Sequence, residues 1–161
     1  MFVVSYGVFP MRQWVVHPIG ENTGRADGMR HSPPPMNKTA IVPSGAAPAV
    51  GPYSHAVRVG ELLFCAGQIP VAPETGEMVT GEIRAQTERV LENLKLILNN
   101  EKLTFANVVK TTVFLTSLAD FAAMNEVYGR YFSAPYPARS TIQVAALPRG
   151  ANVEIEAIAH Y

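Results

Sequence analysis

Two helix-periodic segments set among strand-periodic ones limit the folds open to this chain. Residues 82–100 carry apolar side chains on one helical stripe, with charged residues outside it. In residues 121–132, aromatic and Met side chains recur every three or four positions, and Pro135 and Pro137 end that segment. Because an amphipathic helix must bury its apolar stripe, we expect both helices to pack against a sheet.

The strands of that sheet are predicted from β-branched runs and from two-residue alternation. Gly60-Glu61 separates the first two as a hairpin, because glycine accepts the positive φ of a two-residue turn. The S-x-x-D spacing of Ser117 and Asp120 predicts a capped start for the second helix. The predicted order β-β-α-β-α-β-β is an α+β domain with two helices on one face of the sheet. The five strands are residues 56–59, 62–66, 108–116, 138–147 and 153–160.

Alternation along the later strands separates two faces of the sheet. The aliphatic face, with Val109, Val113 and Ile142 among its residues, is the one that we expect the helices to cover. The second face either meets water or meets another copy of the chain, and the period leaves both alternatives open. Its residues are aromatic, aliphatic and polar, namely Phe114, Arg139, Thr141, Gln143, Glu154, Glu156 and Ile158.

Composition argues against several classes of protein. The 161 residues include 13 Lys and Arg and 13 Asp and Glu, and a formal net charge of +0 gives nucleic acid little to bind. The single cysteine, Cys65, cannot form an intrachain disulfide, which favours a reducing compartment such as the cytoplasm. The spacing of His and Cys indicates no metal site. No apolar run reaches the ~18 residues of a membrane span, so we expect no membrane partner.

Residues 1–36 differ in character from the rest of the chain. They end in a proline run, residues 33–35, and show no helix or strand period. We interpret them as a disordered tail or as a start codon assigned too far upstream, with Met36 as the natural start. A transit peptide is the alternative, which Glu21 and Asp27 disfavour. The expected domain therefore spans residues 37–161.

Few residues stand out as candidates for chemistry. Arg139 offers a fork of donors that matches a carboxylate, although pairing with Glu154 or Glu156 across the sheet is the commoner role of such an arginine. Either glutamate can orient a water near an electrophilic imine, or can be an ordinary exposed strand residue. Tyr53 follows a Gly-Pro turn and either packs or presents its hydroxyl. Cys65 lies in an aliphatic run and is expected in the core.

Other catalytic signatures are weak or missing. Ser54, His55 and Asp120 supply the residue types of a hydrolase triad, but no G-x-S-x-G elbow surrounds the serine. The sequence also has no phosphate-binding loop, dinucleotide fingerprint or H-E-x-x-H stretch. Composition and single residues thus leave the function open.

Several motifs in register resemble those of the RidA/YjgF family of reactive intermediate deaminases. The C-terminal signature is carried by residues 137–142 (PARSTI), 145–148 (AALP) and 153–157 (VEIEA). The resemblance covers about residues 37–161, and several motifs in one order are more specific than any single one. The remaining motifs are residues 51–54 (GPYS), 67–70 (GQIP), 110–113 (KTTV) and 120–121 (DF), followed by Asn125.

The resemblance implies a chorismate-mutase-like fold and a homotrimer. Three copies would join through their sheets into a barrel-like core with the helices outside and three pockets between subunits. Arg139 would bind the carboxylate of the substrate, and Glu154 would hold and activate the attacking water. A guanidinium and a carboxylate on neighbouring strands would thus converge in a cleft that a second subunit completes. The residues implied to bind the substrate or line the pocket are Tyr53, Gly67, Phe121, Asn125 and Thr141.

The activity implied is hydrolysis of 2-iminobutanoate and 2-iminopropanoate to 2-keto acids and ammonia. No cofactor is expected, because a protonated imine is already electrophilic. Thr141 stands where many relatives carry Cys, and Ala66 stands where Ser is common; neither change touches the Arg139–Glu154 pair. Two alternatives remain, a non-catalytic metabolite-binding or chaperone-like trimer and, against the near-neutral charge, an endoribonuclease.

Overall fold

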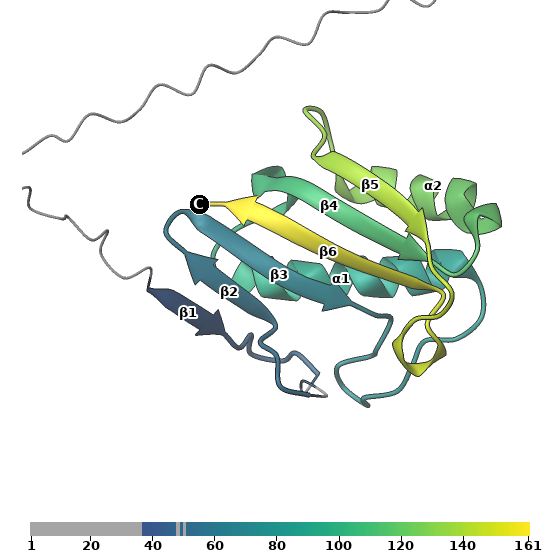
Figure 1. Ribbon diagram of the computed structural model, residues 1–161, viewed down its shortest axis with the longest axis horizontal. Coiled ribbons are helices and arrows are strands. Elements are labelled where there is room, and N and C mark those ends of the chain that lie inside the picture. The colour runs from purple at the N-terminus through teal and green to yellow at the C-terminus, as the bar shows by residue number, and fades with distance from the viewer. Residues whose placement is uncertain (1–36, 48, 50) are drawn as a thin grey trace, which may run out of the picture. The chain divides into compact units, whose positions relative to one another are not determined.

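A mixed sheet carries two α-helices on one of its faces (Figure 1). The computed structural model describes residues 37–47, 49 and 51–161, so the interpretation of residues 1–36 lies outside the described part. Helix α1 spans Ile83–Asn100 and helix α2 spans Phe121–Tyr131. The strands are β1 (Lys38–Ile41), β2 (Ala56–Val59), β3 (Leu62–Gln68), β4 (Val108–Leu115), β5 (Ala138–Gln143) and β6 (Val153–His160).

The strand order across the sheet is β1-β2-β3-β6-β4-β5. All neighbours are antiparallel except β4 and β5, which are parallel and joined through α2. The predicted α+β arrangement is confirmed, and so is the hairpin, in which Val59 faces Leu62 across Gly60 with its φ of 57°. The pattern does not predict β1, because this strand has four residues and pairs only with β2.

The capped start of the second helix is also confirmed. The Ser117 hydroxyl accepts a hydrogen bond from the Ala119 amide at 3.2 Å. It caps the short 3₁₀ turn Leu118–Asp120, from which α2 continues. A side-chain oxygen in this place satisfies an amide that the first turn leaves without an internal partner.

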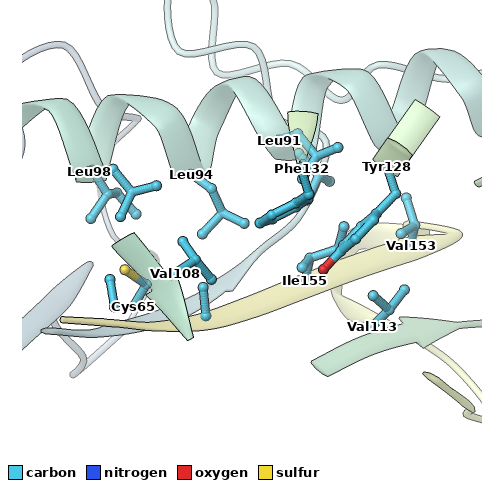
Figure 2. Packing of buried hydrophobic residues seen from close by; sticks show 14 of the residues in the cluster. Cys65, Leu91, Leu94, Leu98, Val108, Val113, Tyr128, Phe132, Val153 and Ile155 are labelled. Atoms are coloured by element: carbon cyan, nitrogen blue, oxygen red, sulfur yellow. The ribbon is translucent and has the colours of Figure 1, made fainter. Parts of the chain in front are cut away.

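The core lies between the two helices and the sheet. Figure 2 shows Leu91, Leu94 and Leu98 of α1 pointing toward the sheet, where Cys65, Val108 and Ile155 belong to the same cluster. Burying such aliphatic side chains is the dominant favourable contribution to folding. Neither helix, nor any other in the described part, is long and apolar enough to cross a membrane.

Cys65 is part of this core, as the sequence predicts. Its side chain lies among the aliphatic residues in Figure 2 and is buried. Burial raises the pKa of the Cys65 thiol to about 12, because the apolar surroundings disfavour the thiolate. The thiol is therefore unsuited to act as a nucleophile.

The opposite face of the sheet carries large apolar side chains that the helices do not cover. Phe64 of β3 is 41% exposed and Ile142 of β5 is 47% exposed. Phe114 and Ile158 lie on the same face, as the pairing of Phe64 with Ile158 and of Phe114 with Ile142 shows. An apolar surface interspersed with polar residues is typical of a face that meets another protein surface.

The structure corrects the face predicted for Arg139 and Thr141. In the parallel pairing of β4 with β5, Thr111 lies opposite Arg139 and Val113 lies opposite Thr141. Directly opposed residues share a face, and Thr111 and Val113 are fully buried beneath the helices. Arg139 and Thr141 therefore lie on the helix side, as does Gln143. The prediction is wrong because the aliphatic residue of this edge strand, Ile142, points to the uncovered face.

Two smaller predictions also fail at strand irregularities. The register of β4 with β6 shifts between Val108 and Lys110, so Val109 leaves the buried face and is 48% exposed. Strand β5 ends at Gln143 and does not reach Leu147. Its pairing ends with the bond from the Val144 amide to the Leu115 carbonyl, and the 3₁₀ turn Pro148–Gly150 then leads the chain into β6.

Candidate functional site

The candidate site residues fall into two clusters on opposite faces of the sheet. We call the first the carboxylate pocket, defined by Glu154, Gly67 and Tyr53, which line one cavity. We call the second the arginine pocket, defined by Arg139 and Asn125, which line another cavity. The other two predicted site residues belong with the arginine pocket, Phe121 because its ring faces the guanidinium and Thr141 because it lies on the same strand face.

The carboxylate pocket has a volume of about 590 Å³ and lies where β3 passes β6. The register of these strands shifts between Cys65 and Gln68, which places Gly67 against the Glu154 side chain. A β-carbon at position 67 would collide with the Glu154 carboxylate. The close approach therefore requires glycine at this position, because any other residue would displace the carboxylate.

The surroundings of Glu154 make its carboxylate more basic than usual. Burial raises its pKa, and the negative charge of Glu156 on the same strand face raises it further. Within the described residues, no hydrogen bond or ion pair holds the Glu154 oxygens. A half-buried carboxylate of this kind is suited to accept a proton from a bound water.

Tyr53 and His55 form part of the wall of the carboxylate pocket. Tyr53 is 50% exposed, so it is not the packing tyrosine that the sequence left as one alternative. Its ring meets the His55 ring edge-on, with centroids 6.3 Å apart. In the part of the chain that the structure describes, no hydrogen bond joins Ser54, His55 and Asp120, so the weak triad signal gains no support.

The arginine pocket has a volume of about 330 Å³ and lies between α2 and the start of β5. The Arg139 guanidinium carbon lies 4.6 Å from the centre of the Tyr128 ring and 5.7 Å from that of Phe121. Such a guanidinium is held by the negative faces of aromatic rings. Among the described residues, no hydrogen bond occupies the Arg139 N–H donors, and such donors suit a planar anion.

Arg139 does not pair with Glu154 or Glu156 across the sheet, which is the commoner role of such an arginine. The salt bridges among the described residues involve Arg84, Arg130 and Lys95, and none joins Arg139 to Glu154 or Glu156. The prediction that Arg139 and Glu154 lie on neighbouring strands is also wrong, since β4 lies between β5, which carries Arg139, and β6, which carries Glu154. Because the sheet separates the two groups, a small ligand cannot touch both of them within one chain.

Sequence reasoning missed two aromatic residues of the arginine pocket, Tyr128 and Tyr136. The helical period assigns Tyr128 to the apolar stripe, and it gives no sign that the ring also meets a guanidinium on the following strand, β5. Tyr136 lies between two prolines in a loop, where no period exists. For metals, the described residues hold no group of three or more His, Cys, Asp or Glu side chains able to bind an ion.

Comparison with known proteins gives close matches along this part of the chain. The family model described as Endoribonuclease L-PSP matches residues 44–161. Protein DfrA of Myxococcus xanthus is 56% identical over 126 residues, covering 77% of this chain and 96% of that protein. The human 2-iminobutanoate/2-iminopropanoate deaminase is 43% identical over 120 residues, covering 74% of this chain and 88% of its own length. The crystal structure of Escherichia coli TdcF with bound serine is 44% identical with a TM-score of 0.73, covering 76% of this chain and 98% of that one.

Proposed function

This chain belongs to the RidA/YjgF family, and from that premise we propose that it hydrolyses 2-iminobutanoate and 2-iminopropanoate to 2-keto acids and ammonia. Relatives named as imine deaminases support a deaminase activity at the level of the family. The observation that carries the proposal is that Arg139, for the substrate's carboxylate, and Glu154, for water, both lack an ionic partner among residues 37–47, 49 and 51–161.

The two groups can meet only if they come from different chains. We propose a homotrimer in which the uncovered sheet face, with Phe64 and Ile142, is buried between subunits. In this assembly the arginine pocket of one subunit lies against the carboxylate pocket of the next. The apolar residues on that face and the exposure of Tyr53 at the pocket wall support this arrangement.

In the proposed reaction, Arg139 holds the substrate's carboxylate by paired hydrogen bonds and so fixes the imine carbon. Glu154 takes a proton from water as the water oxygen bonds to the carbon of the protonated imine, and the C=N electrons move to the cationic nitrogen, which becomes a neutral amino group. The protonated Glu154 then returns its proton to the amino group. The C–N bond breaks, the hydroxyl oxygen forms the ketone, and the hydroxyl proton leaves with ammonia as ammonium.

The remaining candidate residues have supporting roles in this proposal. Gly67 leaves space for the carboxylate that positions the water, and Tyr53 closes the wall beside it. Phe121, Asn125 and Thr141 belong to the arginine side and limit the space open to the substrate. No metal or organic cofactor takes part in the proposed reaction.

A coupled assay tests the proposal. An amino-acid oxidase or a threonine dehydratase generates the imine, and release of the keto acid is timed with and without the protein. The wild-type protein should accelerate release, whereas Glu154→Gln should slow turnover on the order of 10²- to 10⁴-fold while retaining ligand binding. Sedimentation equilibrium should give three chains per particle; a fully active monomer would overturn the shared site.

A non-catalytic role in binding small metabolites is the second candidate. It is favoured by the TdcF structure, because that relative holds serine. Under this reading the wild-type protein binds the ligand but leaves the imine's lifetime in the coupled assay unchanged. Arg139 then remains necessary for binding, and Glu154→Gln has no effect.

A further inference from the structure

Among the described residues, Arg139 contacts aromatic rings and forms no ion pair with an acidic side chain. The nearer ring belongs to Tyr128, 4.6 Å from the guanidinium carbon, and the farther one to Phe121, which is itself 40% exposed. A ring engages the flat face of a guanidinium and leaves the N–H donors at its edge free. This is a way of fixing an arginine without occupying the donors that a substrate needs.

The Tyr128 ring is itself fixed from two sides. Its hydroxyl shares a hydrogen bond of 2.8 Å with the Thr111 hydroxyl, and both residues are buried. Its ring stacks on Phe132 with centroids 4.2 Å apart and planes 20° apart. Figure 2 shows Tyr128 reaching toward the sheet, with its oxygen at the sheet end and Phe132 alongside.

Thr111 connects this arrangement back to the arginine. It lies directly opposite Arg139 in the pairing of β4 with β5, on the same face. The pairing of β4 with β5 therefore fixes the position of the Arg139 backbone relative to the Thr111 hydroxyl, which in turn holds the Tyr128 ring. Burial raises the pKa of Tyr128, which keeps its hydroxyl protonated and able to donate to Thr111.

We infer that Tyr128, anchored by Thr111, is a positioning residue that orients the Arg139 guanidinium for the substrate's carboxylate. This inference rests on the proposed function, in which Arg139 binds that carboxylate. Because the carboxylate is bound equally in the ground state and the transition state, a misplaced guanidinium weakens both. Loss of the ring should therefore raise KM by a larger factor than it lowers kcat, since Arg139 also fixes the imine carbon.

Kinetics of two tyrosine variants on α2 test the inference. Tyr128→Leu removes the ring beneath the guanidinium and should raise KM about tenfold, the size expected for one partly desolvated cation–π contact. Tyr131→Leu is the matched control, because it makes the same truncation on the same helix at a residue whose hydroxyl binds Glu92. The control should change neither KM nor kcat.

Milder variants separate orientation from loss of packing. Tyr128→Phe keeps the ring and Thr111→Val keeps the shape of the threonine, while each removes the shared hydrogen bond. Both should raise KM about threefold, and Thr111→Ser should restore it. An unchanged KM in Tyr128→Leu, or a fall of kcat alone in these variants, would overturn the inference.

A measurement without turnover distinguishes this inference from the proposed function. The Arg139 Nε–Hε signal in a ¹⁵N-labelled protein, assigned by its loss in Arg139→Lys, should be displaced by the ring current of Tyr128. Tyr128→Leu should return it toward the position of an exposed arginine, and should weaken binding of 2-oxobutanoate. If the wild-type protein accelerates no imine hydrolysis, the proposed function fails while this signal still tests the positioning. An Arg139 signal that is the same in both proteins refutes the positioning even if imine hydrolysis is fast.

Discussion

The carboxylate pocket destabilises the charged form of Glu154, whereas the arginine pocket stabilises the charged form of Arg139. Glu154 is disfavoured as an anion by burial and by the like charge of Glu156. Arg139 rests against two rings that favour its cation. Neither group forms an ion pair with the residues that the structure describes, and each lines a cavity that a ligand can enter. The difference indicates that the anion is prepared to accept a proton and the cation to bind an anion.

Removal of the guanidinium should have the largest effect on this pair. Arg139→Ala should lower kcat/KM for 2-iminopropanoate by roughly 30- to 5,000-fold, because truncating one side of a buried, hydrogen-bonded charge pair costs about 2–5 kcal/mol. Arg139→Lys should recover little, since an ammonium cannot form the paired hydrogen bonds of the fork. Turnover at the wild-type rate by the Ala variant would remove Arg139 from the mechanism.

Mixing two inactive variants tests whether the pockets come from different chains. Arg139→Ala and Glu154→Gln chains, unfolded together and refolded at equal amounts, form sites that take each group from a different subunit. Random assembly leaves about one quarter of the sites with both groups, so activity should return to about that fraction of the wild-type value. Refolding each variant alone is the control. No recovery in the mixture would place both groups of each site on one chain.

The space around the Glu154 carboxylate can be reduced by a substitution at Gly67, whose backbone lies against it. Gly67→Ala adds a β-carbon where the carboxylate lies, so Glu154 must move. We expect kcat to fall by up to about 10²-fold, because small displacements of a catalytic group have effects of that size. A thermal unfolding curve checks that the fold persists. Full activity in this variant would show that Glu154 has more freedom than the structure indicates.

The smallest expected effect concerns the charge beside Glu154. Glu156→Gln removes a negative charge that raises the pKa of Glu154, so that pKa should fall. The base is active when deprotonated, and the acid limb of the pH profile of kcat/KM should therefore move to lower pH. Burial, the larger cause, remains, so the shift is partial. The same substitution at Glu88, exposed on α1, should leave the profile in place.

The sequence predicts the central elements of this fold well and its edges poorly. Residues 153–160 alternate because β6 has a neighbouring strand on each side and one face in the core, and the predicted bounds are those observed. Strand β5 lies at the edge, with one neighbour and little buried surface. Because an edge strand buries little surface, its apolar side chains need not face the core, and in this chain Ile142 lies outside the core. That is why the face of Arg139 could not be predicted.

The candidate site shows the same limit. Family resemblance selects Arg139 and Glu154, and the structure places both in pockets. Their separation by β4 depends on strand order, which no local pattern in the sequence encodes. The role of Tyr128 depends on the register between β4 and β5, two consecutive strands joined through α2. Such relations arise from the folded topology and from the assembly, and not from spacing.

The placement of Arg139 and Glu154 on opposite faces has a genetic consequence in the proposed trimer. Each copy lends its arginine to one site and its glutamate to another. A single copy damaged at both positions therefore silences two of the three sites around the ring. In a cell that makes intact and damaged copies together, inheritance of such an allele would be partly dominant, with activity falling faster than the supply of intact chains.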